Sequence, residues 1–216
     1  MAQYVIEVKG ISKIYNKEVV LDSVSCQFEK GKTYGIVGRN GSGKTLLLKS
    51  ICGFIIPDSG YVIVDGKKVG TDVDIPEGIG AIIETPGFIM SYSGMRNLRI
   101  LATIKGEISK KEIRDVMELV GLDPQSRKPV GKYSLGMRQK LGIAQAIMEN
   151  PDILILDEPM NGLDNESVTK MREVLKKLSE AGTTILLASH NQEDINSLCD
   201  EVIYMDHGRI IGEKEQ

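Results

Sequence analysis

The octapeptide GRNGSGKT, residues 38–45, constrains the fold of this chain more than any other stretch. It follows the apolar run TYGIV and precedes KTLLLKSI, a run that favours a helix ending at Gly53. Glycines let backbone N–H groups converge on phosphate oxygens, and the helix start adds a positive dipole. This GxxxxGK[ST] pattern between a strand and a helix predicts a nucleotide-phosphate site. Its expected ligand-binding residues are Gly38, Arg39, Asn40, Gly41, Ser42, Gly43, Lys44 and Thr45.

Four apolar runs are typical of buried parallel strands, and each ends in a residue capable of chemistry. The runs are residues 33–38, 80–84, 152–158 and 183–190, which end at Gly38, Glu84, Asp157 with Glu158, and His190. Helical patterns alternate with them, such as the apolar repeat that follows the capping box of Ser109 and Glu112. This alternation predicts an α/β fold. Because open parallel sheets bind ligands at the carboxyl ends of their strands, the four endings should form one site.

Composition excludes several classes of protein. The 216 residues carry 27 Lys+Arg and 30 Asp+Glu, a net charge of −3, so the basic excess of a nucleic-acid binder is missing. The three cysteines are scattered singly, which argues against zinc or a disulfide framework and favours a reducing cytoplasm. Neither a signal peptide nor an apolar stretch of about 20 residues is apparent. We expect one compact unit, with the last strand at 201–206 and no regulatory domain after it.

Two further segments suggest how a bound nucleotide would be used. In LILDEP, Asp157 suits the coordination of Mg²⁺, and Glu158 is placed to orient or deprotonate an attacking water. In YSLGMRQKLGIAQAI, Ser134 is a predicted N-cap of a helix that ends before Pro151. Such a helix start is a second phosphate-binding end. Because the chain already has one phosphate loop, the second is expected to act on the nucleotide of a partner chain.

These motifs, in this order, resemble the nucleotide-binding subunit of an ATP-binding cassette (ABC) transporter over nearly the whole chain. GRNGSGKT is similar to Walker A, ILILDEP to Walker B, and SLGMRQ to the signature usually written SGGQ. NGLD (161–164) resembles the D-loop, and His190 falls at the switch histidine. The resemblance implies a parallel-sheet P-loop NTPase core, an N-terminal antiparallel β subdomain and an inserted helical subdomain. It places core and β subdomain at about 1–84 and 152–216, and the helical subdomain at about 85–151.

The family mechanism is carried over position by position. Two copies would close head-to-tail on two Mg-ATP, each held between the Walker A loop of one chain and Ser134 and Gly136 of the other. Lys44 would contact the β/γ-phosphates and Thr45 the Mg²⁺. Glu158 would act as general base and His190 would contact the γ-phosphate. Tyr15 falls where the family stacks an aromatic ring on adenine.

Two departures from the family pattern are informative. Glu84 replaces the usual Q-loop glutamine, so a possible metal ligand also brings negative charge toward the γ-phosphate; simple substitution without consequence is the alternative. Leu135 and Met137 replace Gly and Gln of the signature. Glu84 followed by TPGF, and SLGMRQ followed by LGIA, resemble the cassettes of bacterial exporters for bacitracin-like and lantibiotic-like peptides, which work with a separate membrane permease.

Three functions are therefore weighed. The first is the energising subunit of such an exporter, peripheral on the inner face of the membrane. The second is a soluble stand-alone ABC ATPase in an assembly or cell-division complex. The third is a binding module without catalysis, which the presence of Lys44, Thr45, Glu158 and His190 argues against. Residues 85–106, with Phe88, Ile89, Met90 and Tyr92, either pack the helical lobe or form the groove for the permease.

Overall fold

A six-stranded sheet forms the centre of the computed structural model, which describes residues 4–106 and 108–215. Its strand order is β10-β9-β3-β8-β7-β6; all neighbours are parallel except the β10–β9 pair. The strands of this sheet are β3 (Thr33–Val37), β6 (Ile79–Ile82), β7 (Ile153–Asp157), β8 (Thr184–Ala188), β9 (Glu201–Asp206) and β10 (Arg209–Glu215). The buried parallel strands that the apolar runs predict are thus present.

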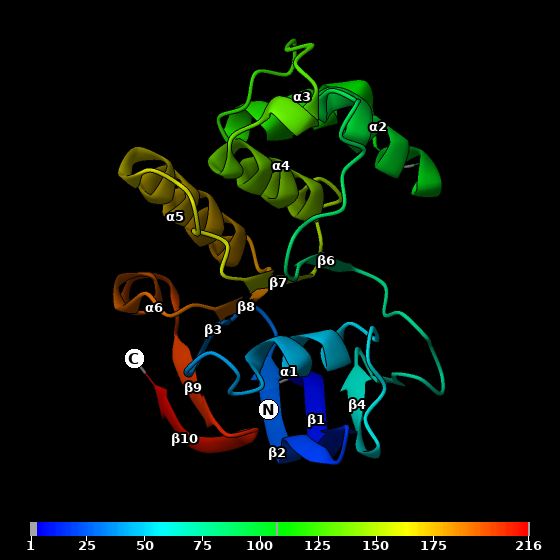
Figure 1. The fold of residues 1–216 in the computed structure, drawn as a ribbon, viewed down its shortest axis with the longest axis vertical. Coiled ribbons are helices and arrows are strands. Elements are labelled where there is room, and N and C mark those ends of the chain that lie inside the picture. The colour runs from blue at the N-terminus through cyan, green and yellow to red at the C-terminus, as the bar shows by residue number, and fades with distance from the viewer. Residues whose placement is uncertain (1–3, 107, 216) are drawn as a thin grey trace.

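A second, antiparallel sheet lies beside the first at the bottom of Figure 1, with the order β2-β1-β4-β5. Its strands are β1 (Tyr4–Tyr15), β2 (Glu18–Glu29), β4 (Ser59–Val64) and β5 (Lys67–Lys68). Helix α1 (Lys44–Ile51) packs between the two sheets, because its Leu47, Leu48 and Ile51 are fully buried in a cluster that includes side chains of both. The phosphate loop at the start of α1 is therefore held on a rigid base.

Three helices, inserted in the chain between β6 and β7, form the upper lobe of Figure 1: α2 (Gly94–Lys105), α3 (Lys110–Leu119) and α4 (Leu135–Ile147). A single-turn helix, η1 (Val130–Lys132), precedes α4. Helices α5 (Asn165–Glu180) and α6 (Gln192–Leu198) follow β7 and β8. The parallel-sheet core, the antiparallel β subdomain and the helical insertion that the sequence leads us to expect are thus all present. In the described part of the chain, no helix combines the length and apolar character needed to cross a bilayer.

One hydrophobic cluster runs from the helical lobe into the sheet. It contains Leu98 of α2, Met117 of α3 and Leu141 of α4 together with Leu156 of β7 and Leu187 of β8. The lobe and the parallel sheet therefore share buried apolar surface, the main favourable contribution to folding. The three cysteines are buried and unpaired, and burial raises the pKa of the Cys52 and Cys199 thiols to about 12.

Two details differ from what the sequence predicts. Phe88 is only 7% exposed and packs in the core of the helical lobe, so the proposed groove cannot include it; Ile89 and Met90 are the exposed apolar side chains there.

The last strand is not 201–206, because residues Arg209–Glu215 return as β10 along the edge of β9. The physical reason is that β9 has an open edge, and a tight turn at His207 and Gly208, both with positive φ, pairs the following residues with it.

The predicted capping box of α3 is present: Ser109 Oγ accepts from the Glu112 N–H, and Glu112 Oε2 accepts from the Ser109 N–H. We expect Ser109→Ala to lower the free energy of unfolding by about 1 kcal/mol, because the Glu112 N–H at the helix start loses its partner. Urea unfolding would measure this. Replacement of the exposed Ser91 by alanine is the control, and an equal effect of both changes would contradict the role of the cap.

Candidate functional site

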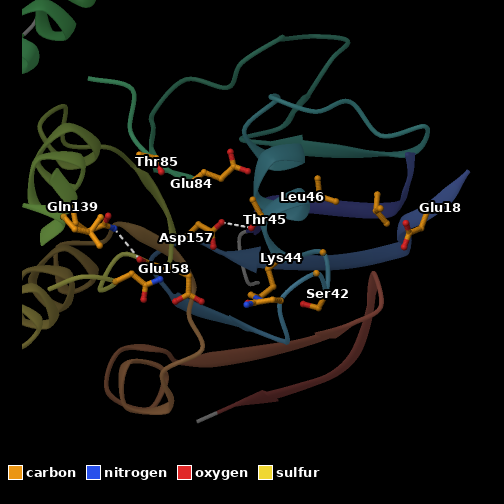
Figure 2. A pocket seen from close by; sticks show the side chains of 16 residues that line it. Glu18, Ser42, Lys44, Thr45, Leu46, Glu84, Thr85, Gln139, Asp157 and Glu158 are labelled. Atoms are coloured by element: carbon orange, nitrogen blue, oxygen red, sulfur yellow. Dashed lines mark hydrogen bonds between the residues drawn. The ribbon is translucent and has the colours of Figure 1, made fainter. Parts of the chain in front are cut away.

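A cavity of about 660 Å³ opens at the carboxyl edge of the parallel sheet (Figure 2). Its walls come from the phosphate loop, the start of α1, the ends of β6 and β7, and the first turns of α4. The lining includes Asn40, Gly41, Ser42, Gly43, Lys44, Thr45, Glu84, Asp157 and Glu158. Segments far apart in the sequence thus bring most of the predicted site residues to one place.

The phosphate loop has the backbone that its glycines allow. Gly41 and Gly43 have φ of 81° and 101°, and a Cβ at Gly38 would collide with the carbonyl oxygen of Met205. The Lys44 Nζ donates to the carbonyl oxygens of Gly38 at 2.7 Å and Arg39 at 3.1 Å. The buried Ser42 Oγ has no hydrogen-bond partner among the described residues. A cradle with an ammonium and an unpaired hydroxyl suits an anionic ligand.

The start of α1 meets the end of β7 beside this loop. Thr45 Oγ1 donates to Asp157 Oδ2 at 2.6 Å, as the dashed line in Figure 2 shows. A hydroxyl and a carboxylate are the oxygen ligands that Mg²⁺ prefers alongside phosphate oxygens. These two side chains therefore fit a Mg²⁺ ion carried by a nucleotide.

Glu158 and His190 are in contact, although they follow different strands. His190 Nδ1 lies 2.9 Å from Glu158 Oε2. Glu158 has φ of 51°, its N–H donates to the Ala188 carbonyl oxygen at 2.9 Å, and Gln139 Nε2 donates to its carbonyl oxygen at 3.4 Å. The strained backbone and these bonds hold the carboxylate at the rim of the cavity.

Glu84 also has a positive φ, 61°, at the end of β6. Its Oε1 lies 2.7 Å from the Nζ of Lys49, which is on α1 one turn after Thr45. The side chain of Glu84 is 63% exposed and lines the cavity, whereas that of Lys49 is 23% exposed. The carboxylate is thus paired with a lysine that the phosphate-loop motif does not include.

Hydrogen bonds between Arg172 of α5 and Asp194 anchor the loop that carries His190. Arg172 of α5 donates through Nε and Nη2 to Asp194 Oδ1, at 2.8 and 2.6 Å, and Asp194 is fully buried. Ser189 Oγ donates to the other carboxylate oxygen at 3.3 Å and accepts from the Asn191 N–H at 3.1 Å. The residues on both sides of His190 are therefore tied to α5.

Helix α5 itself begins at the D-loop, where Asp164 caps it by accepting from the Ser167 N–H at 2.8 Å. That backbone hydrogen bond lowers the pKa of the Asp164 carboxyl. The helix thus connects the segment 161–164 to the His190 loop.

Six predicted site residues are not among those that line the cavity: Gly38, Arg39, His190, Ser134, Gly136 and Tyr15. Ser134 caps α4 by accepting from the Met137 N–H at 3.1 Å, and Gly136 lies against the Gly162 carbonyl oxygen. Use of this helix start by a second chain stays a prediction. Tyr15 is exposed at the end of β1, paired in register with Glu18, whose side chain lines the cavity.

The sequence analysis gives no role to several residues of this region, among them Lys49, Gln139 and Glu18, and it treats Leu135 only as a departure from the signature. For Lys49 a signal was available, because a residue four positions after Thr45 lies on the same face of a helix. Leu135 and Gln139 reach the cavity only because α4 is inserted next to it. Glu18 reaches it through the β1–β2 hairpin, which the sequence does not place.

Comparison with known proteins agrees with this geometry. The sequence profile described as "ABC transporter" matches residues 21–161. YybJ of Bacillus subtilis (strain 168), an uncharacterized ABC transporter ATP-binding protein, is 44% identical over 95% of this chain and 94% of its own length. The bacitracin transport ATP-binding protein BcrA of Enterococcus faecalis is 41% identical over 98% of this chain and 69% of its own. The solved cassette described as the dimeric structure of MJ0796, a bacterial ABC transporter cassette, superposes with a TM-score of 0.88 at 25% identity, over 97% and 98% of the two chains.

Proposed function

Because this chain belongs to the ABC transporter family as an ATP-binding protein with ATPase activity, we propose that it powers a bacterial exporter by closing, as a dimer, on two Mg-ATP. The observation that carries the proposal is the cavity that the phosphate loop, Thr45, Asp157 and Glu158 line together, with His190 in contact with Glu158. Such an arrangement can hold a triphosphate, its metal and an attacking water together.

The chemistry is hydrolysis of the terminal phosphoanhydride. Lys44 and the loop N–H groups would bind the β- and γ-phosphates, and Thr45 and Asp157 would hold a Mg²⁺ ion, which would supply positive charge beside the phosphates. Glu158 would take a proton from water as the water oxygen attacks the γ-phosphorus, and the bond from that phosphorus to the bridging oxygen would break. His190, 2.9 Å from Glu158, would orient this carboxylate and contact the γ-phosphate.

Dimerisation supplies the second wall of each site. We propose that Ser134 and Gly136 at the start of α4 bind the ATP held by the partner's phosphate loop, and that Tyr15 stacks on adenine. We also propose that residues 85–151 form one helical subdomain. If that subdomain moves as a unit, α4 and Ser134 move together. Hydrolysis would then reopen the dimer, and the opening would drive the permease.

The proposed permease surface is the exposed part of residues 85–106. Ile89 and Met90 are half exposed at one end of α2, and Ile100 and Ile104 are exposed along it. Exposed apolar side chains of this kind mark a partner site. The chain would thereby be cytoplasmic and peripheral on the inner face of the membrane. The similarity to BcrA supports a peptide antibiotic as the exported class.

Purification of the chain from its own cells in mild detergent, followed by mass spectrometry, tests this proposal. We expect a polytopic membrane protein in stoichiometric amount. The double change Ile89→Asp and Met90→Asp should abolish its recovery while ATP binding is kept, because charge would be placed on the apolar contact. Ile211→Asp, at an exposed isoleucine on β10, is the matched control and should leave recovery unchanged.

Recovery of soluble assembly or cell-division proteins alone would contradict the exporter function and favour a stand-alone ABC ATPase. Unchanged recovery of the permease with the double variant would contradict only the position of the docking surface.

A further inference from the structure

The pair of Glu84 and Lys49 is not explained by nucleotide binding as described so far. Their charged atoms lie 2.7 Å apart, within charge-assisted hydrogen-bond distance. One partner follows β6 and the other lies on α1, so the contact bridges the parallel sheet and the helix that begins with the phosphate loop. Neither side chain has another ion pair among the described residues.

The backbone fixes where this pair can lie. Lys49 is four residues after Thr45 on the same face of α1, next to the Thr45–Asp157 contact. Glu84 has a φ of 61°, a conformation that few non-glycine residues adopt, which turns it out of the line of β6. Its side chain lines the same cavity wall as Thr45. Figure 2 shows Glu84 on the α1 side of Asp157.

The ion pair of Glu84 and Lys49 matters because most of the charged side chains that line the cavity are negative. Four carboxylates line it, those of Glu18, Glu84, Asp157 and Glu158, against one lining ammonium among the described residues, that of Lys44. A nucleoside triphosphate adds several negative charges to this space. Like charges a few ångströms apart repel, and at a partly exposed site the repulsion is reduced but not removed by solvent. An unpaired Glu84 carboxylate would therefore oppose the terminal phosphate.

We propose that Lys49 is a positioning residue that holds the Glu84 carboxylate against α1 and neutralises it, so that the cavity accepts a γ-phosphate despite the acidic residue. The inference rests on the proposed function in that the ligand is a nucleoside triphosphate. It assigns to Lys49 a selectivity for triphosphate over diphosphate, because only the triphosphate brings its last phosphate toward Glu84.

The test is calorimetric titration of ATP and ADP, each in EDTA, into the full chain and its variants. Without metal, the measurement reports charge balance alone. Lys49→Met should weaken ATP binding about three- to five-fold, the range of a partly exposed ion pair, and ADP binding less. In the Glu84→Gln background, Lys49→Met should weaken ATP binding clearly less, because no carboxylate is left for Lys49 to hold against α1, and only the direct attraction between its ammonium and the phosphates is lost. Lys49→Arg should keep the native affinity.

Lys32→Met is the matched control. Lys32 pairs with Glu201 at 2.6 Å, at the opposite, amino-terminal end of β3, so its loss should leave both affinities unchanged. Urea unfolding midpoints verify that each variant is folded.

An equal weakening by Lys49→Met with and without Glu84 would overturn the proposal, as would equal effects on ATP and ADP. A native chain that binds neither nucleotide even when Mg²⁺ replaces the EDTA would instead contradict the proposed function, so the two failures are distinguishable.

Discussion

Glu158→Gln is expected to lower ATP hydrolysis by about a hundred-fold or more, the usual contribution of a general base. The amide keeps the size of the carboxylate and can still bond to His190, which lies 2.9 Å from Glu158 in the native chain, but it cannot take the proton of the attacking water. Phosphate contacts through Lys44 and the loop are untouched. ATP should therefore bind, and the closed dimer should accumulate.

Steady-state phosphate release measures the first effect, and size-exclusion chromatography with Mg-ATP measures the second. Glu173→Gln, an exposed carboxylate on α5, is the control and should behave as the native chain. Native turnover by Glu158→Gln would show that another group activates the water.

Lys44→Ala should weaken ATP binding by at least ten-fold, since a hydrogen bond to a charged group contributes about 1.5–3 kcal/mol. The change also removes the ammonium that bonds to the carbonyl oxygens of Gly38 and Arg39, so the loop loses its internal support. Equilibrium binding of ATP at a fixed Mg²⁺ concentration measures the effect.

The exposed Lys67 of β5 provides the comparison: Lys67→Ala removes the same charge far from the loop. Equal affinities of the two alanine variants for ATP would mean that net charge, and not the contact at the phosphate, determines binding.

The fold was predictable where local chemistry and tertiary structure agree. The capping box at Ser109 and the N-cap at Ser134 are present, because each depends on residues close in sequence. The parallel strands are present as well, because their short apolar runs suit strands that are buried on both faces. The edge strand β10 was not predicted, since its residues RIIGEKE become a strand only through pairing with β9. Helix α2 was also missed, although Ser93 caps it by accepting from the Arg96 N–H at 3.3 Å.

The site was predictable as a set of residues but not as a set of contacts. That the strand endings lie on one edge follows from parallel topology. The contacts between individual side chains do not follow from the topology. Glu84 pairs with Lys49, and Phe88 lies in the core although its neighbours Ile89 and Met90 are exposed. Both outcomes depend on the path of residues 83–93 between sheet and lobe, which has no regular periodicity from which to infer it.

The buried bond between Arg172 and Asp194 determines how the catalytic edge moves. Exposing the Asp194 carboxylate without its guanidinium would leave a charge unpaired in the interior, which makes opening of residues 189–194 a rare event and not a continuous fluctuation. The exposed His190 ring can rotate about its side-chain bonds while its backbone stays fixed. The bond also joins α5 to α6, so a displacement of α5 would carry the backbone around His190 with it.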